Sequence, residues 1–199
     1  MAVAALPPAP PAHRRNVLLA GSLLAVAAGT MLMGTLLGIY FETRDAAQAA
    51  GEAWPPEGVE LPNVALAVAY GTLAMSSVFA AWAGAALRLG DRRQAYMAVG
   101  LTVAFGLLFI NALSFCWQQL GIVAGESPFA DVVWAVTGVH ALLVLAAVVA
   151  FVVMGFRVLG GQLSARNREL VLAAAAFWHF VVAAGAAIYW CLWFLMGGP

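Results

Sequence analysis

The sequence predicts an all-α integral membrane protein: a bundle of five transmembrane helices with its N-terminus inside and its C-terminus outside. Three observations predict this class. The 199 residues are 64% hydrophobic and only 9% charged, with a mean hydropathy of +0.94, whereas soluble domains carry about 25% charged residues. Five long apolar stretches follow one another along the chain. Arginine is concentrated in alternate segments between them.

The chain begins with an alanine- and proline-rich segment, residues 1–15, that ends in two arginines. Because its prolines oppose helix formation, we expect a short solvated tail. A cleaved signal peptide is the alternative, but the apolar run of residues 16–41 exceeds the roughly 7–15 residues of a signal-peptide core. We therefore expect residues 16–199 to form a single five-helix membrane domain.

Each apolar stretch has about 24–27 residues, or about 36–40 Å of helix, which crosses a bilayer with some tilt. Helices are expected because a backbone in lipid must satisfy its own hydrogen bonds. The expected spans are Asn16–Phe41, Val64–Leu87, Ala95–Leu120, Val132–Phe156 and Leu170–Met196.

The distribution of charge predicts the orientation. With the N-terminus inside, eight of the nine arginines lie in inner segments and only Arg44 lies outside. Seven of the nine acidic residues lie outside. Such an arginine bias near the ends of spans is the positive-inside pattern. We expect a multi-pass protein of a bacterial plasma membrane.

Small residues recur four apart in the first two spans, at Gly34 and Gly38 and at Ala80 and Gly84, and they predict closely packed helices. The outer half of the third span is polar, and we expect its side chains to form interhelical hydrogen bonds. These residues are Asn111, Ser114, Gln118 and Gln119.

Several function classes are disfavoured by what the spans contain. No Asp, Glu, Lys or Arg lies inside any span, whereas pumps and ion-coupled transporters place ionisable groups there. No basic tail, cysteine cluster or glycine-rich phosphate loop occurs, which argues against nucleic acid and nucleotides as partners. Cys116 and Cys191 both fall near outer helix ends, so a disulfide is topologically possible, although buried thiols are the simpler interpretation.

Two of the three histidines, His140 and His179, lie inside the expected spans. One hypothesis is that they ligate a b-type haem between the fourth and fifth helices. Their positions on antiparallel helices differ in depth by roughly 10 Å, however, and two ligands of one iron require similar depth. Hydrogen bonding within the bundle is the alternative.

Tryptophans gather near the expected outer interface, as in an aromatic belt. They are Trp54, Trp117, Trp134, Trp190 and Trp193.

Short motifs then occur in order along the five spans. They are Gly38-Ile39-Tyr40-Phe41, Trp54-Pro55-Pro56, Pro62-Asn63, Ser76-Ser77, Gly90-Asp91, Gly106 with Phe109, Trp117 with Leu120, Thr137-Gly138-Val139-His140 and Trp178-His179-Phe180-Val181. In this order and placement the sequence resembles the subunit III family of haem–copper oxidases, in its short five-helix form.

The chain also departs from that family, which marks it as a divergent member. The family's second histidine is replaced by Leu143, and the aspartate after His-Phe-Val is replaced by Val182. The family's intramembrane acids and glutamine fall at Ala28-Gly29, Leu113 and Cys116.

The resemblance implies an accessory subunit of a cytochrome c oxidase-type terminal oxidase that is itself non-catalytic and binds no haem or copper. It would pack on the haem–copper catalytic subunit I beside other oxidase subunits, hold phospholipids, and support stable turnover and proton uptake. The motif residues would be structural or lipid contacts: Trp54, Ser76, Ser77, Trp117, Thr137, Gly138, His140, Trp178 and His179. A partner of a nitric-oxide reductase or quinol oxidase, a free-standing b-type cytochrome anchor and a small transporter are the alternatives.

Overall fold

The computed structural model describes residues 16–164 and 167–195, and this part of the chain is helical with short connections. The expected tail at residues 1–15 lies outside the described residues. The elements are α1 (Val17–Ala49), α2 (Asn63–Leu89), α3 (Arg92–Leu120), α4 (Pro128–Leu159), α5 (Glu169–Ile188) and a terminal π-helical segment, η1 (Tyr189–Phe194).

Within the described residues, five helices are long and apolar enough to cross a membrane, as the sequence predicts, with η1 completing the fifth. Helices α1 to α4 extend beyond the predicted spans at one or both ends, whereas the fifth begins one residue before its predicted span, at Glu169. The first helix continues to Ala49, so the polar residues after Phe41 are also helical although they lie outside the apolar stretch. The fourth begins at Pro128, where the Ser127 hydroxyl accepts a hydrogen bond from the backbone N–H of Ala130 and proline occupies a first-turn position that favours it.

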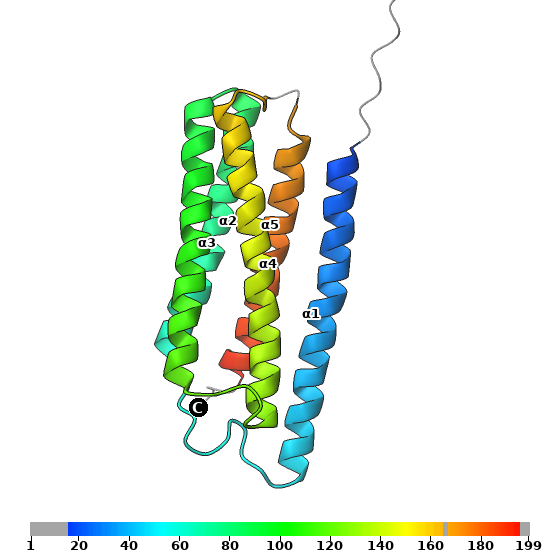
Figure 1. Cartoon of the computed structure of the whole chain (residues 1–199), viewed down its shortest axis with the longest axis vertical. Coiled ribbons are helices and arrows are strands. Elements are labelled where there is room, and N and C mark those ends of the chain that lie inside the picture. The colour runs from blue at the N-terminus through cyan, green and yellow to red at the C-terminus, as the bar shows by residue number, and fades with distance from the viewer. Residues whose placement is uncertain (1–15, 165–166, 196–199) are drawn as a thin grey trace, which may run out of the picture.

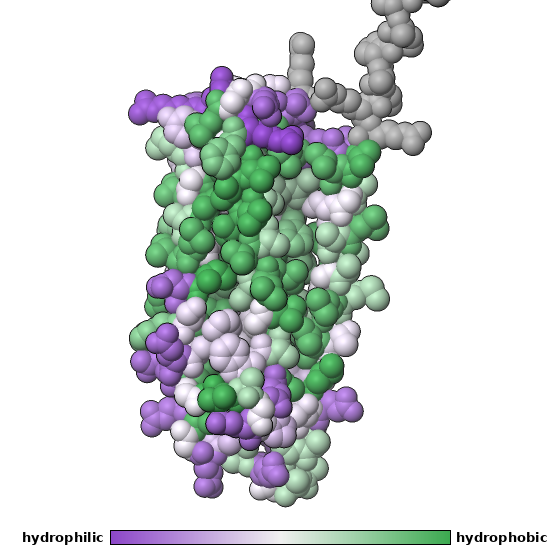
Figure 2. Space-filling view, viewed as in Figure 1, coloured by the Kyte–Doolittle hydropathy of each residue, from purple (hydrophilic) through white to green (hydrophobic). Residues whose placement is uncertain are grey.

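The helices stand side by side and nearly parallel to one axis, and the chain reverses direction after each one (Figure 1). Helix α2 packs against α3 and α5, α3 packs against α4, and α4 packs against α5. Helix α1 stands at one side, where it contacts α5 and α4. The surface in view carries a broad apolar band between polar ends, which is the pattern expected of a membrane-spanning bundle (Figure 2).

The turn between α2 and α3 is built by the motif Gly90-Asp91. Gly90 has a φ of +77°, a left-handed conformation that glycine adopts without strain, so it can end α2 sharply. The Asp91 carboxylate then accepts a hydrogen bond from the backbone N–H of Gln94 and caps the start of α3.

Close helix packing depends only in part on the residues that the four-residue spacing indicates, since Ala80 is buried and a methyl group added at Gly84 would contact Val171 of α5 at 3.9 Å. A methyl group added at Gly34 or Gly38 would meet nothing within 4 Å, so this pair does not join helices within the chain. At Gly29 the added carbon would lie 2.6 Å from the ring of Phe180, and at Gly106 it would lie 2.7 Å from both Trp178 and Val148. Contacts as short as those at position 106 could not be tolerated without movement. Glycine at this position therefore lets α3 pack directly on α4 and α5.

Candidate functional site

Two adjacent serines of α2 meet two adjacent residues of α5. The indole Nε1 of Trp178 donates a 2.9 Å hydrogen bond to the hydroxyl of Ser76, and both side chains are buried. One residue further along each helix, the hydroxyl of Ser77 lies 2.7 Å from Nδ1 of His179. The motifs Ser76-Ser77 and Trp178-His179, 102 positions apart, are therefore in register across the α2–α5 contact.

These two pairs face different surroundings. Trp178 is fully buried and stacks edge to face on Phe151 at a centroid distance of 4.8 Å. His179 lies on the exposed side of α5, and its hydrogen bond to Ser77 is also at the surface. The buried pair Ser76–Trp178 thus joins the helices in the core. The exposed pair Ser77–His179 presents an imidazole to the surroundings of the bundle.

The second histidine, His140 of α4, is fully buried. Its Nε2 lies 2.9 Å from the backbone carbonyl oxygen of Val181. Because a carbonyl can only accept, Nε2 carries a proton and donates it to this bond. The two signatures Thr137-Gly138-Val139-His140 and Trp178-His179-Phe180-Val181 are therefore joined by a direct hydrogen bond between α4 and α5.

The remaining residues of the α4 signature lie on the helix turn that contains His140. Thr137 is buried, and its hydroxyl accepts a 3.0 Å hydrogen bond from Nε1 of Trp117 on α3 while donating to the carbonyl of Val133. Gly138 is half-buried, and an added methyl group there would meet nothing within 4 Å. No contact in the structure explains why glycine occupies that position.

Trp54, in the segment between α1 and α2, docks against Tyr40 of α1. Its Nε1 donates a 3.1 Å hydrogen bond to the hydroxyl of Tyr40, which is fully buried. Its ring packs edge to face on Phe129 of α4 at a centroid distance of 5.0 Å. The motifs Gly38-Ile39-Tyr40-Phe41 and Trp54-Pro55-Pro56 therefore hold this connection against the bundle.

The arrangement does not suit a haem between the two histidines. The Nε2 of His140 is engaged by Val181, its ring is enclosed by Phe109 and Tyr70, and His179 lies on the exposed surface of the bundle. Over the described ranges, no three His, Cys, Asp or Glu side chains are grouped so that they could hold a metal ion. The hydrogen-bonded interpretation of the two histidines fits these contacts better than the haem hypothesis.

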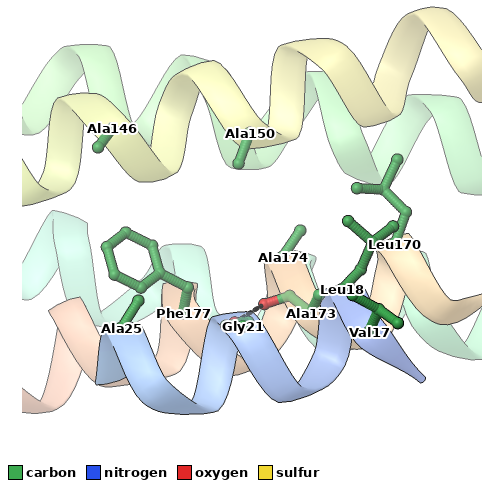
Figure 3. A pocket seen from close by; sticks show the side chains of 11 residues that line it. Val17, Leu18, Gly21, Ala25, Ala146, Ala150, Leu170, Ala173, Ala174 and Phe177 are labelled. Atoms are coloured by element: carbon green, nitrogen blue, oxygen red, sulfur yellow. Dashed lines mark hydrogen bonds between the residues drawn. The ribbon is translucent and has the colours of Figure 1, made fainter. Parts of the chain in front are cut away.

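An apolar groove runs between one end of α1 and the adjoining halves of α4 and α5 (Figure 3). Its volume is about 430 Å³. Its walls consist mainly of small and aliphatic side chains with one aromatic ring. They are Val17, Leu18, Gly21, Ala25, Ala146, Ala150, Leu170, Ala173, Ala174 and Phe177, together with Ser22.

Polar contacts at the base of this groove attach α1 to α5. One carboxylate oxygen of Glu169 accepts hydrogen bonds from the backbone N–H groups of Leu18 at 2.6 Å and Leu19 at 3.3 Å. The hydroxyl of Ser22 donates a 2.6 Å bond to the carbonyl of Ala173. Since the first N–H groups of a helix have no partner within it, Glu169 caps α1 from another helix and places a negative charge at its positive end.

Two residues that surround His140, Tyr70 and Gly185, carry little signal in the sequence. Tyr70 packs against both His140 and Phe109 and is only 6% exposed. Gly185 allows His140 to approach α5, because a methyl group there would lie 3.1 Å from the imidazole Cε1. A tyrosine in an apolar span carries a weak signal, whereas a glycine in a chain with 20 glycines carries none.

Other predictions are corrected by the side-chain contacts. Of the polar residues expected to join α3 to other helices, Ser114 bonds the carbonyl of Ile110 in its own helix, and the three amides are exposed. Trp193 is 2% exposed and so lies inside the bundle, not in a lipid-facing belt. Cys116 and Cys191, by contrast, are free thiols, which is the interpretation that the sequence favours over a disulfide.

Together these features define a class: a multi-pass helical membrane protein whose ordered motifs are interhelical hydrogen bonds and close helix contacts. The comparisons with known proteins identify the family. The profile of the family described as "Cytochrome c oxidase subunit III" matches residues 12–196. The chain belongs to this family, as the motif resemblance indicates.

Curated relatives support the assignment. A "Probable cytochrome c oxidase subunit 3" from Nocardia farcinica is 28% identical over 85% of this chain and 83% of its own length. One from Mycobacterium bovis is 26% identical over 92% of this chain and 90% of its own length. The "Cytochrome c oxidase subunit 3" of Strongylocentrotus purpuratus is 29% identical over 72% of this chain, which spans only 56% of that longer protein.

Proposed function

We propose that this chain is the accessory, non-catalytic subunit III of an aerobic respiratory terminal oxidase of the cytochrome c oxidase type. The family match over residues 12–196 carries this proposal. It is supported by the placement of the family motifs at helix contacts, as in the bonds of Trp178 to Ser76 and of His140 to Val181. Haem, copper and the reduction of oxygen would belong to catalytic subunit I of the complex.

The contacts of the motif residues favour a structural role for this subunit. The Thr137 hydroxyl and the Trp117 indole are paired with each other across α3 and α4, as the Ser76 hydroxyl and the Trp178 indole are across α2 and α5. Paired hydroxyl, indole and imidazole groups fix helix positions but offer no reactive group to a substrate. Stable turnover and proton uptake would therefore be supported by assembly, with this chain holding its partner in one arrangement.

The groove at α1 is proposed to hold a phospholipid acyl chain. Its volume of about 430 Å³ and its alanine-lined walls suit a flexible hydrocarbon chain. Replacing Ala150 by phenylalanine would fill the groove, so the purified protein should retain less phospholipid, as measured by mass spectrometry. Replacing the exposed Leu142 of the same helix by phenylalanine is the matched control, because Leu142 lies outside the groove.

We also propose that the N-terminus is inside and that the membrane is a bacterial plasma membrane. The arginine distribution supports this orientation, with Arg88, Arg92 and Arg157 at one end of the bundle. Reporter fusions in the α2–α3 turn and in the α3–α4 turn would test it. Activity of an inside-only reporter in the α3–α4 turn would reverse the assignment.

Turnover measurements test the accessory role itself. Membranes from cells that lack this chain should consume oxygen with reduced cytochrome c, but activity should decline over successive turnovers and should be restored when the chain is supplied. Because the haems would lie in another subunit, the haem spectrum of any assembled oxidase should be unchanged. An oxidase that sustains turnover equally well without the chain would refute the role.

A further inference from the structure

The surface pair Ser77 and His179 lies near the middle of the membrane. Ser77 is close to the midpoint of α2 (Asn63–Leu89), and His179 is about 4 Å from the midpoint of the fifth span (Glu169–Phe194) along the helix axis. The pair joins Nδ1 of the imidazole to the serine hydroxyl at 2.7 Å. The imidazole is exposed, so its Nε2 is left for a group outside this chain.

A lipid cannot supply that group. The hydrocarbon core extends about 15 Å to each side of the bilayer midplane, and its acyl chains contain no hydrogen-bonding atoms. Phospholipid headgroups therefore lie on the order of 10 Å away from His179. Within a membrane a polar group without a partner is costly, so a neighbouring protein is the available source of a hydrogen bond.

The α2 surface beside this pair carries several small exposed residues, which a neighbouring helix could approach closely. Its exposed residues include Gly71, Ala74, Val78 and Ala81, spaced three or four apart. This spacing places them along one face of the helix, and small side chains allow another backbone to approach closely. Nothing lies within 4 Å of a methyl group added at Gly71, so the chain itself does not cover this face.

The same face continues toward a positively charged end. From Ala81 toward the α2–α3 turn it opens into a hollow of about 290 Å³ between α2 and α5, bounded at its end by Arg88 and Arg168. Neither arginine forms an ion pair with a carboxylate within residues 16–164 and 167–195. A covering helix with an acidic group at this end would complement the two charges.

We propose that the α2–α5 face around Ser77 and His179 is the surface on which a transmembrane helix of a partner subunit docks. The partner helix would offer a hydrogen-bonding side chain to Nε2 of His179 at mid-membrane depth. It would place an acidic group near Arg88 and Arg168. This inference rests on the proposed function, which supplies the existence of a membrane partner, and assigns the face that the partner covers.

Two substitutions at His179 separate docking from an internal role. In His179→Asn the amide occupies the position of Nδ1 and can still reach Ser77. In His179→Gln the amide reaches the position of Nε2 and can still meet an outside group. Each tagged variant, together with the wild type and His179→Leu, is isolated from native membranes in mild detergent. The co-isolated protein is quantified per chain.

Docking predicts that His179→Leu and His179→Asn retain about 3- to 15-fold less partner than wild type, the range that one interhelical hydrogen bond contributes in membranes. His179→Gln should recover most of the loss. Ala74→Leu should also weaken association by thickening the α2 face, whereas the control Ala135→Leu on the exposed surface of α4 should not. Unfolding of each isolated chain in detergent shows whether the variants remain folded.

The outcomes separate the two proposals. If the wild type brings down no other subunit, the proposed function fails. If the wild type retains a partner and all variants retain it equally, the docking face is wrong while the function stands. Rescue by asparagine and not by glutamine would also overturn docking, because it would assign His179 only to Ser77. Loss of bound phospholipid with no loss of partner would contradict a protein occupant.

Discussion

Gly106 provides the sharpest test of how the helices pack. In Gly106→Ala the new methyl carbon would lie 2.7 Å from the ring of Trp178 and 2.7 Å from a methyl group of Val148. Distances below 3.0 Å require one of the neighbours to move, and Trp178 is held by its hydrogen bond to Ser76. Overpacking of this kind costs about 1–3 kcal/mol.

The matched control is Gly100→Ala on the same helix, where an added methyl group meets nothing within 4 Å. Both substitutions change helix propensity equally, so the difference between them isolates the overpacking. We expect the free energy of unfolding, measured by denaturation with sodium dodecyl sulfate, to be about 1–3 kcal/mol lower for Gly106→Ala than for Gly100→Ala.

A second substitution tests the cause of this difference. Val148→Ala removes one of the two clashing groups, so the double variant Gly106→Ala/Val148→Ala should recover part of the lost stability relative to the sum of the single effects. Equal stability of Gly106→Ala and Gly100→Ala would refute the packing of α3 on α4 and α5. Additive single effects would place Val148 away from Gly106.

Three further predictions concern the interhelical contacts and the thiols. Trp178→Phe and Ser76→Ala should each lower the free energy of unfolding by about 1 kcal/mol, and the double variant should lose less than their sum, because both remove one bond; additive effects would contradict the bond. Glu169→Gln should weaken the capping of α1 by about 0.5–2 kcal/mol and speed hydrogen exchange at its first amides, and unchanged exchange would refute the cap. Maleimide should label Cys191 faster than the buried Cys116 without prior reduction, and labelling only after reduction would indicate a disulfide.

The number and order of the helices could be predicted from the sequence because the bilayer sets the length of an apolar span. The faces of the helices could not. In a soluble protein the buried face is apolar and the outer face polar, but here both the interior and the lipid-facing surface are apolar. Nothing local therefore shows that Trp178 points inward while His179, the next residue, points outward.

Contacts between distant segments could not be predicted from the sequence either. The motifs Ser76-Ser77 and Trp178-His179 are visible separately, yet their pairing depends on the register of α2 against α5. In the sequence, Glu169 is a charged residue at the end of a span. Its hydrogen bonds to the start of α1 cannot be predicted, because α1 lies about 150 positions away in the chain. The spacing of Gly34 and Gly38 predicts a packing contact, but these glycines face away from the other helices of the chain.

The identity of the complex tests the account most directly. The tagged chain is isolated from native membranes in mild detergent, its co-isolated proteins are identified by mass spectrometry, and the haem of each separated subunit is measured optically. We expect a haem–copper catalytic subunit in a fixed ratio to this chain, with haem absorption in that subunit alone. A chain isolated without such a partner, or a Soret band that remains with the separated chain, would contradict it.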